Sequence, residues 1–338
     1  MTAPLNRIVI FGAGALGGLL GGKLSRVAPV VLVARPAVAA VLRAHGLRLA
    51  GQSNETLACG PNFRIVSKAV ADLTLQPGDA ILLTVKAGAV SEALNELASL
   101  PRAPGTPSLP LFGLQNGTGF EGALHAAAAH GFRPLHAVAH LGATLVEPGL
   151  IEDWGGELLL PEDPAGHALA ALLANAGLKA RTLPDLEVWR WKKIAFNCAL
   201  NALSAILEVR NRETIRPEWR ALRKQVLCEA RAAAALHGVN LPPADALLEE
   251  FEGRAKASNN VNSMWQDLQR GRRTEAAYLN GAVAERVVLK ERWAPSANAW
   301  LARIVQELED ARDATAQAEI RRRGIARLQA LVAEEAQA

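Results

Sequence analysis

The sequence predicts an α/β domain built on a doubly wound parallel sheet, followed by an all-helical domain. A strand-like run, a glycine-rich turn and a helix-like run follow one another at residues 7–18. Strand and helix patterns then alternate to about residue 183, as they do in parallel sheets whose crossovers are helices. Beyond Pro184 the strand patterns cease and helix-like segments succeed one another. We therefore expect two domains, at residues 1–183 and 184–338.

The first predicted strand, residues 8–11, runs directly into Gly12-Ala13-Gly14-Ala15-Leu16-Gly17. Three glycines at this spacing, between a strand and a helix, are typical of a turn that binds a dinucleotide. Gly12 permits the sharp turn, Gly14 lets the backbone approach a pyrophosphate, and Gly17 lets helix and strand pack closely. The amides that open the helix can receive the phosphates. The alternative is a glycine-rich turn with no ligand.

The second predicted strand, Val30–Ala34, is followed by Arg35. Many NAD-binding proteins carry an acidic residue at this strand end, where it binds the ribose hydroxyls. An arginine can instead hold a 2′-phosphate through charge-assisted hydrogen bonds, which favours NADP(H) over NAD(H). The alternative is that Arg35 only solvates the strand end.

Turn residues and apolar runs predict the other elements of the first domain. Helices are expected at 36–45, 90–100, 119–130 and 167–176, and strands at 80–85, 109–114, 135–141 and 179–182, with an extended stretch at 46–49 and a loop or weak strand at 51–70. Residues 144–151 and 157–160 predict antiparallel strands that extend the sheet edge. Lys86 and Asn116 follow two of these strands, at the edge where open sheets bind ligands. A solvated lysine and an Asn-Gly turn are the alternatives.

The helical domain is predicted to break at 210–217, 238–243, 257–261 and Pro295. Near its start, Lys193, Asn197, Asn201 and Ser204 recur at steps of four, four and three, so they share one helix face. Amides and an ammonium in an otherwise apolar helix indicate a buried polar cleft. Amides that only cap or join helices are the alternative. The adjacent Lys192 does not keep the four-residue steps.

The composition limits the classes of function. The chain is 50% hydrophobic and 21% charged, which excludes disorder, and a net charge of +4 suits an anionic small-molecule ligand better than a nucleic acid. No apolar run reaches the roughly 18 to 20 residues of a membrane span. Cys59, Cys198 and Cys228 form no C-x-x-C pair, so we expect a reducing, cytoplasmic compartment and no metal site. A homodimer is kept as a candidate assembly.

Taken together, these motifs resemble the ketopantoate reductase (2-dehydropantoate 2-reductase) family over nearly the whole chain. The pieces that carry the resemblance are the turn at 12–17, Lys86, Gln115-Asn116-Gly117, the Lys193, Asn197 and Asn201 helix, Asn211, and the run from Asn260 and Ser263 to Thr274-Glu275. The resemblance implies a Rossmann-like N-terminal domain that binds NADP(H) and a helical substrate domain of the 6-phosphogluconate dehydrogenase C-terminal type. It also implies NADPH-dependent reduction of 2-dehydropantoate to pantoate by hydride transfer, in pantothenate biosynthesis.

The resemblance also implies roles for individual residues. Lys193 is expected to be the general acid and Glu275 to orient it, with both contacting the substrate. Arg35, Lys86 and Asn116 are expected at the cofactor, together with the turn at 12–17. The residues expected to bind the substrate are Asn116, Lys193, Asn197, Asn201, Asn211, Asn260, Ser263 and Glu275.

Several structural alternatives remain open from the sequence. Glu275 could pair with Arg272 or Arg273, and Ser263 could cap a helix with Gln266 completing a capping box. Residues 151–163 depart most from the family pattern, so any difference from the family is expected in the substrate and not in the chemistry. The same scaffold could reduce another branched 2-oxoacid, and a non-catalytic NADP(H)-binding sensor is the third hypothesis.

Overall fold

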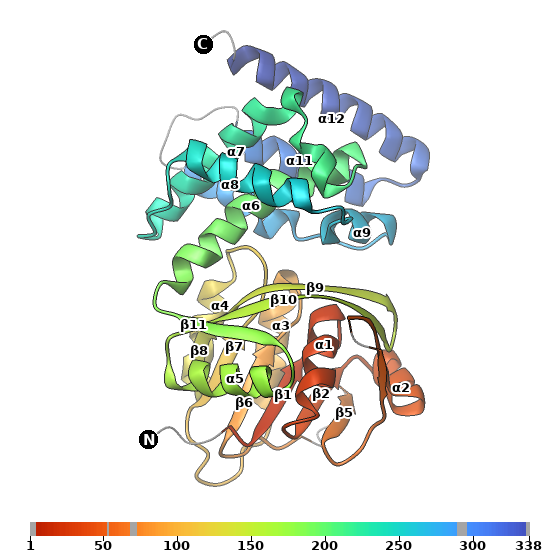
Figure 1. Ribbon diagram of the computed structural model, residues 1–338, viewed down its shortest axis with the longest axis vertical. Helices are drawn as coiled ribbons and strands as arrows, with labels where there is room; N and C mark the ends of the chain where they lie inside the picture. The colour runs from red at the N-terminus through yellow and green to blue at the C-terminus, as the bar shows by residue number, and fades with distance from the viewer. Residues whose placement is uncertain (1–4, 53, 68–72, 289–295, 336–338) are drawn as a thin grey trace. The chain divides into compact units, whose positions relative to one another are not determined.

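A computed structural model describes residues 5–52, 54–67, 73–288 and 296–335 (Figure 1). The chain forms two compact units. The first comprises Met1–Gln115 and Phe120–Leu186, and the second comprises Asn116–Gly119 and Glu187–Ala338. The assignment of cofactor binding to one part and substrate binding to the other stays a prediction, and the predicted break at Pro295 lies outside the described residues.

A six-stranded parallel sheet forms the centre of the first unit. Its strands, in spatial order, are β5 (Phe63–Ser67), β2 (Val30–Ala34), β1 (Arg7–Phe11), β6 (Asp79–Leu83), β7 (Leu109–Gly113) and β8 (Phe132–His136). Numbered by their order along the chain, these strands run 3-2-1-4-5-6, the order of doubly wound dinucleotide-binding sheets. The predicted fold class is therefore confirmed. The strand order reverses between β1 and β6, and ligands of such sheets bind at this point.

A second, five-stranded sheet corrects one prediction. Its strands are β3 (Leu47–Gly51), β4 (Glu55–Leu57), β9 (Val138–Glu147), β10 (Leu150–Pro161) and β11 (Lys179–Leu183). The hairpin of β9 and β10 was expected to extend the edge of the first sheet, but β10 pairs with β3 and β11 instead. The predicted strand 135–141 spans the end of β8 and the start of β9. Apolar periodicity cannot say which sheet a strand joins, because it reports only burial.

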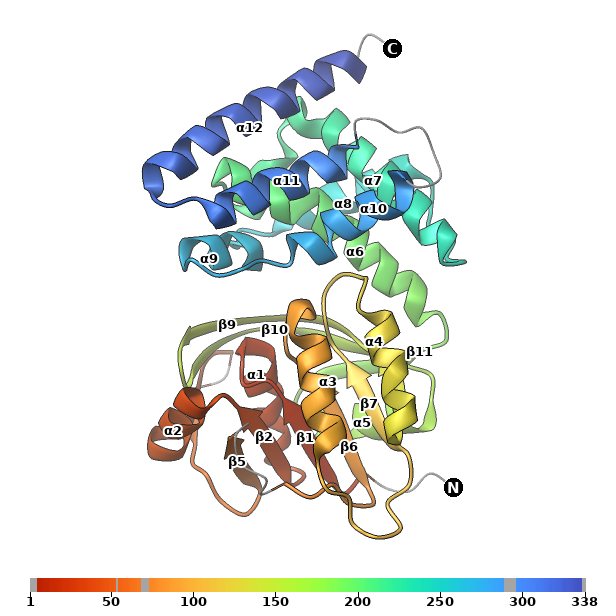
Figure 2. The same ribbon diagram turned by 180° about the vertical axis from the view of Figure 1, so that it is seen from behind.

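The helices of the first unit are α1 (Ala15–Leu24), α2 (Pro36–His45), α3 (Val90–Ser99), α4 (Glu121–Ala126) and α5 (Pro164–Asn175), with short 3₁₀ turns η1 (Ala87–Ala89) and η2 (Ala127–His130). Figure 2 shows α3 and α4 on one face of the six-stranded sheet. Helix α1 packs against strands of both sheets, and its residues from Gly17 onward are buried. Its glycines allow this: a Cβ on Gly22 would lie 2.7 Å from Leu57 Cδ1.

A buried ion pair joins α1 to the second sheet. Lys23 Nζ lies 3.2 Å from Asp153 Oδ2 on β10, and the two side chains are 10% and 3% exposed. The other oxygen, Oδ1, accepts a hydrogen bond from the amide of Gly155 at 2.9 Å. A charged group in a helix that is otherwise apolar requires such a partner, because an unpaired buried ammonium is strongly disfavoured.

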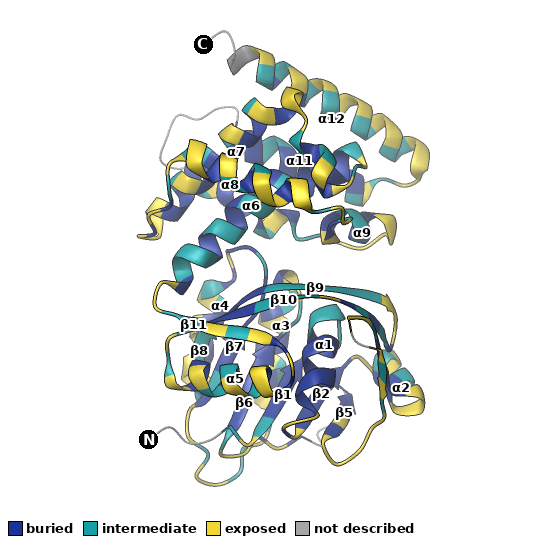
Figure 3. Cartoon of the chain, viewed as in Figure 1, coloured by how far each residue is buried: buried dark blue, intermediate teal, exposed yellow. Residues whose placement is uncertain are grey.

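The second unit is helical. Its elements are α6 (Leu186–Leu207), η3 (Asn211–Ile215), η4 (Pro217–Trp219), α7 (Arg220–Leu236), α8 (Ala244–Ala257), α9 (Ser263–Gln269), η5 (Ala276–Tyr278), α10 (Asn280–Val288), α11 (Ala297–Asp310) and α12 (Ala314–Glu335). Figure 3 shows α12 with an exposed outer face, whereas α6 is largely buried. The predicted breaks at 210–217, 238–243 and 257–261 separate α6 from α7, α7 from α8 and α8 from α9, and the first of them contains the short helix η3.

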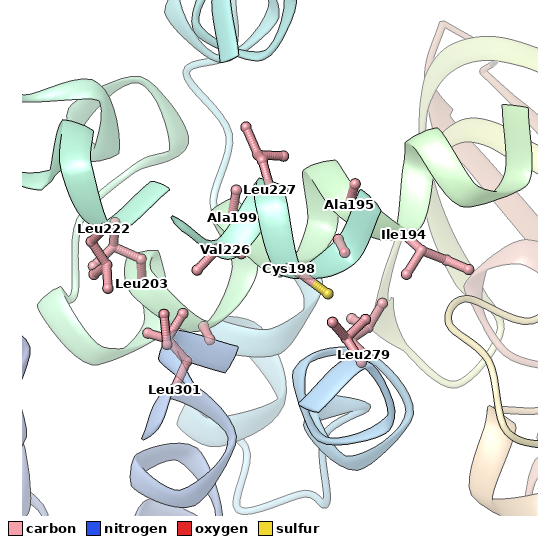
Figure 4. Close-up of a cluster of buried hydrophobic side chains, with 14 of the residues drawn as sticks. Ile194, Ala195, Cys198, Ala199, Leu203, Leu222, Val226, Leu227, Leu279 and Leu301 are labelled. Atoms are coloured by element: carbon pink, nitrogen blue, oxygen red, sulfur yellow. The ribbon is translucent and has the colours of Figure 1, made fainter. Parts of the chain in front are cut away.

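The core of the helical unit surrounds α6. Figure 4 shows Cys198 and Leu203 of α6 among side chains from other helices, including Leu279 and Leu301. Cys198 is fully buried, and burial raises the pKa of its thiol. The thiol therefore stays protonated and packs as a small apolar group.

We predict that Asp153→Asn lowers the free energy of unfolding by about 3 kcal/mol, because it leaves the Lys23 ammonium buried without a counter-charge. Urea denaturation measures this. Adding Lys23→Met should recover most of the loss. The control is Glu147→Gln, which breaks an exposed pair with Arg48 on the same sheet and should cost no more than about 1 kcal/mol. Equal losses from both single variants would contradict the prediction.

Candidate active site

The glycine turn after β1 is shaped by steric contacts. Gly12 has φ +115°, and a Cβ there would lie 2.9 Å from the backbone nitrogen of Val85. A Cβ on Gly17 would overlap the carbonyl oxygen of Gly12. Both positions therefore require glycine for the fold itself, as their predicted roles in turning the chain and packing the helix demand.

Gly14 differs from the other two glycines. Its φ is −83°, and a Cβ there would meet no atom within 4 Å. Gly14 is the N-cap of α1, makes no side-chain cap, and no acidic residue occupies the first turn. The described protein thus leaves open space and unneutralised amides at this helix start, which suits the pyrophosphate of a dinucleotide. Ala13, Ala15 and Leu16 present only small or apolar side chains here, half-buried.

Two side chains brace the strand ends around the glycine turn. Thr84 donates from Oγ1 to the carbonyl oxygens of Phe11 at 3.0 Å and Gly12 at 2.8 Å. Gln115 donates from Nε2 to the carbonyl of Leu83 at 2.7 Å. These bonds connect the ends of β1, β6 and β7 where the sheet order reverses, so they hold the turn in place. Neither side chain is predicted for this role by the sequence patterns.

Lys86 and Arg35 lie where the sequence placed them, after β6 and β2. Each occupies the N-cap position of the next helical segment, with extended backbone angles, and each is exposed. The ends of β2, β1 and β6 are neighbours in the sheet. Two cationic side chains therefore follow β2 and β6, the two strands that neighbour β1 and its glycine turn.

In the helical unit, Lys193 on α6 lies in the electrostatic field of Glu275, which is the N-cap of η5. Burial lowers the pKa of Lys193 from 10.5 to about 8, and the negative charge of Glu275 opposes this shift by favouring the protonated form. Asn116 donates from Nδ2 to Glu275 Oε2 at 3.2 Å. Three predicted site residues, distant in sequence, are thus brought together.

The loop 116–119 belongs to the helical unit, although it follows a strand of the first unit. The amide of Thr118 donates to the carbonyl of Tyr278 at 2.8 Å, and Arg190 donates from Nη1 to the carbonyl of Gly117 at 3.2 Å. Gly117 has φ +89°. Asn116-Gly117 therefore forms a turn, and the contact of Asn116 with Glu275 is compatible with the predicted site role, which stays a prediction. The buried Oδ1 of Asn116 has no hydrogen-bond partner among the described residues.

Two cations near these residues bind other carboxylates. Arg273 binds Glu309 at 3.0 Å and Asp310 at 2.7 Å rather than Glu275. Lys192 binds Glu250 at 2.6 Å on α8, which leaves Lys193 as the lysine facing Glu275.

The polar stripe of α6 passes from half-buried to buried. Lys193 and Asn197 are half-buried, Asn201 is 6% exposed, and Ser204 is fully buried. Ser204 donates from Oγ to the carbonyl of Val209 at 2.6 Å, so it closes the end of the helix. The stripe therefore combines both predicted interpretations, with a structural hydroxyl at one end and the lysine at the other.

The segment 258–263 contains a further correction. Asn262, and not Ser263, is the N-cap of α9, because its Oδ1 accepts from the amide of Trp265 at 3.1 Å. The predicted capping box is absent here, since Gln266 donates to the carbonyl of Val261 at 2.9 Å. Asparagine is a strong N-cap residue, a signal that could have identified it. Ser263 and Asn260 are exposed, so their side chains project from this segment.

Asn211 is buried, and both polar atoms of its side chain form hydrogen bonds. Its Nδ2 donates to Ser258 Oγ at 3.0 Å, and its Oδ1 accepts from Asn262 Nδ2 at 3.3 Å. Its amide donates to the carbonyl of Asn260 at 3.0 Å. Asn211 therefore holds the segment that carries Asn260 and Ser263, and the substrate contact implied for it stays a prediction.

Two other kinds of site are absent from the part of the chain that the structure describes. No three His, Cys, Asp or Glu side chains within them are grouped as metal ligands would be. None of their helices is long and apolar enough to cross a membrane.

Comparisons with known proteins match both parts of the chain. The family model described as ketopantoate reductase PanE/ApbA matches residues 8–158, and the model of its C-terminal region matches residues 185–308. A 2-dehydropantoate 2-reductase from Pyrococcus horikoshii is 31% identical over 86% of this chain and 93% of its own length. One from Archaeoglobus fulgidus is 31% identical over 83% of this chain and 91% of its own.

A solved structure agrees with these relatives. The PanE/ApbA family ketopantoate reductase from Ralstonia eutropha is 30% identical, covers 90% of this chain and 98% of its own, and superposes with a TM-score of 0.78. Matches of this extent include the glycine turn, the strand ends and the lysine helix alike. By sequence and by fold, the chain belongs to the ketopantoate reductase family.

Proposed function

We propose that this protein reduces 2-dehydropantoate to pantoate with NADPH, a step of pantothenate biosynthesis. Family membership supports the reaction class, and the curated relatives from Pyrococcus horikoshii and Archaeoglobus fulgidus are 2-dehydropantoate 2-reductases. The observation that carries the proposal is the half-buried Lys193, whose pKa is lowered to about 8 beside the negative charge of Glu275.

Lys193 acts as the general acid. Reduction of a ketone develops negative charge on the carbonyl oxygen, and a positioned ammonium both stabilises that charge and donates the proton. A pKa of about 8 suits this task, because the lysine is protonated near neutral pH and yields its proton more readily than an ordinary lysine.

Glu275 and Asn116 prepare that lysine and the substrate. The carboxylate keeps the neighbouring ammonium charged, and the amide Nδ2 of Asn116 orients the carboxylate. The buried Oδ1 of Asn116 is an acceptor for a donor that a ligand brings, because buried polar atoms are rarely left without a partner.

Neutral side chains bind the substrate in this proposal. Asn197 and Asn201 extend from Lys193 along α6, and Asn260 and Ser263 project from the segment that Asn211 holds. Amides and a hydroxyl can donate to a carboxylate without adding a formal charge beside the lysine, so they do not further lower its pKa.

The first unit binds the cofactor in this proposal. Gly14 and the start of α1 would hold the pyrophosphate, Arg35 would bind the 2′-phosphate, and Lys86 would contact the cofactor from the neighbouring strand end. When bound, the nicotinamide supplies the two electrons and the hydrogen that add to the substrate carbon. The residues of this unit bind and orient it.

The purified protein is mixed with NADPH and each of a panel of 2-oxoacids, and the loss of NADPH absorbance is measured. We expect oxidation of NADPH with 2-dehydropantoate. Lys193→Ala should lower kcat roughly 10²- to 10⁴-fold, the range for loss of a general acid, while the fold is retained. The rate of the unmodified enzyme should fall above about pH 8, because the lysine must be protonated to act.

Lys192→Ala is the matched control, since this neighbouring lysine binds Glu250. If NADPH is oxidised only with a different branched 2-oxoacid, that acid is the substrate in place of 2-dehydropantoate. If NADPH binds but is oxidised with none of the 2-oxoacids, the protein is a sensor and not a reductase. Turnover by Lys193→Ala at the unmodified rate would remove the lysine from the mechanism.

Arg35→Ala should raise the KM for NADPH about tenfold, because a charge-assisted contact to the 2′-phosphate is lost. The KM for NADH, which lacks that phosphate, should not change. Arg48→Ala, an exposed arginine on β3, is the control. Equal increases in the KM for NADPH and for NADH would mean that Arg35 does not bind the 2′-phosphate.

Two glycine variants should separate folding from cofactor binding. Gly17→Ala should lower the melting temperature, because its Cβ overlaps the carbonyl oxygen of Gly12. Gly14→Ala should melt as the unmodified protein does and bind NADPH about tenfold more weakly, because its Cβ enters the space assigned to the pyrophosphate. Melting curves and NADPH fluorescence titrations measure the two effects; unchanged NADPH affinity in Gly14→Ala would refute the assignment.

A further inference from the structure

We propose that Glu309 and Thr274 are positioning residues that hold Glu275 against Lys193 during catalysis. The proposal rests on the function proposed above and adds two residues to it. Neither lies among the predicted site residues, and Glu309 comes from α11, a helix that carries none of them.

A chain of hydrogen bonds from Glu309 encloses Glu275. Glu309 Oε1 accepts from the amide of Thr274 at 2.8 Å and from its Oγ1 at 2.6 Å. The same Oγ1 accepts from the amide of Ala276 at 3.0 Å. The hydroxyl of Thr274 therefore links the residue before Glu275 to the residue after it, and the carboxylate of Glu309 orients that hydroxyl.

The turn that follows Glu275 also holds the loop of Asn116. The carbonyl of Glu275 accepts from the amides of Tyr278 and Leu279, both at 3.0 Å. The carbonyl of Tyr278 accepts from the amide of Thr118 at 2.8 Å. A displacement of this turn would therefore move both Glu275 and the asparagine that binds its carboxylate.

Glu309 is itself well fixed. Its side chain is 8% exposed, although its partner Arg273 is 72% exposed. At the other end of α11, Ser296 and Ala297 donate to the buried carboxylate of Glu229 at 2.6 and 2.7 Å. Both ends of α11 are thus anchored, and a contact built on such a helix is more precise than one built on a loop.

Small movements of Glu275 matter because its interaction with Lys193 is electrostatic. The charged groups around the turn include Lys193, Glu275, Glu309, Arg273 and Asp310. Attraction between the carboxylate and the ammonium weakens with distance, and solvent entering a loosened turn weakens it further. Loss of the hydroxyl of Thr274 should therefore lower the pKa of Lys193 and misalign the proton donor.

The test compares Thr274→Val and Glu309→Ala with the unmodified enzyme in NADPH-dependent reduction of 2-dehydropantoate. We expect kcat to fall roughly tenfold to 10²-fold, as for a misplaced catalytic group, with the KM for NADPH unchanged. The basic limb of the pH profile of kcat/KM should move to lower pH, because the lysine loses part of its counter-charge. A purely structural role would not move that limb.

Thr274→Ser keeps the hydroxyl and should restore both kcat and the pH profile. Arg273→Ala is the control: it removes the exposed partner of Glu309 and leaves both bonds to Thr274, so it should behave as the unmodified enzyme. The double variant Thr274→Val/Glu309→Ala should lose no more of kcat than the more impaired of the two single variants, since both residues belong to one chain of hydrogen bonds. Additive losses, or an unmoved basic limb, would overturn the proposal.

Amide hydrogen exchange tests the same contacts without turnover. Residues 275–279 should exchange faster in Thr274→Val and Glu309→Ala than in Thr274→Ser. Inactivity of the unmodified protein with every 2-oxoacid would overturn the proposed function, and exchange would still decide whether these residues hold the turn. Unchanged exchange in both variants would overturn the positioning proposal even if the enzyme is active.

Discussion

The negative charge of Glu275 is the constraint on which the site in the helical unit depends. Burial disfavours the ammonium of Lys193 and Glu275 offsets part of that cost, and the pKa of the lysine is lowered to about 8. A carboxylate can do this only from a fixed position. Asn116 binds its side chain, and the turn 274–279 holds its backbone, so three parts of the chain converge on one carboxyl group.

Polar residues near this site divide into those that hold the backbone and those that remain available. Ser204, Asn211 and Asn262 bind backbone or neighbouring side chains, and each fixes a segment end. Asn260 and Ser263 project from the segment so held. For these five residues the division follows burial: the three buried side chains find their hydrogen-bond partners within the protein, whereas the two exposed ones can bind a ligand.

The glycine turn illustrates a separate principle in the first unit. Gly12 and Gly17 are required by contacts inside the protein, whereas Gly14 faces space that the described protein does not fill. One short motif thus contains two residues needed for folding and one whose lack of a side chain has no structural cause. Thr84 and Gln115 then hold the neighbouring strand ends, so the turn keeps its shape through bonds to its surroundings.

By itself, the sequence determined the parallel sheet, the glycine turn, the run of helices and the face shared by Lys193 and Asn197, because strand and helix periodicity and glycine sterics act between near neighbours in the chain. Only the tertiary structure decided that β9 and β10 belong to a second sheet, that Asn116 joins Glu275, that Arg273 binds elsewhere, and that Asn262 caps α9 in place of Ser263. Most of these outcomes depend on contacts between residues far apart in sequence. Periodicity reports which residues are buried, but it does not report which partner each one meets.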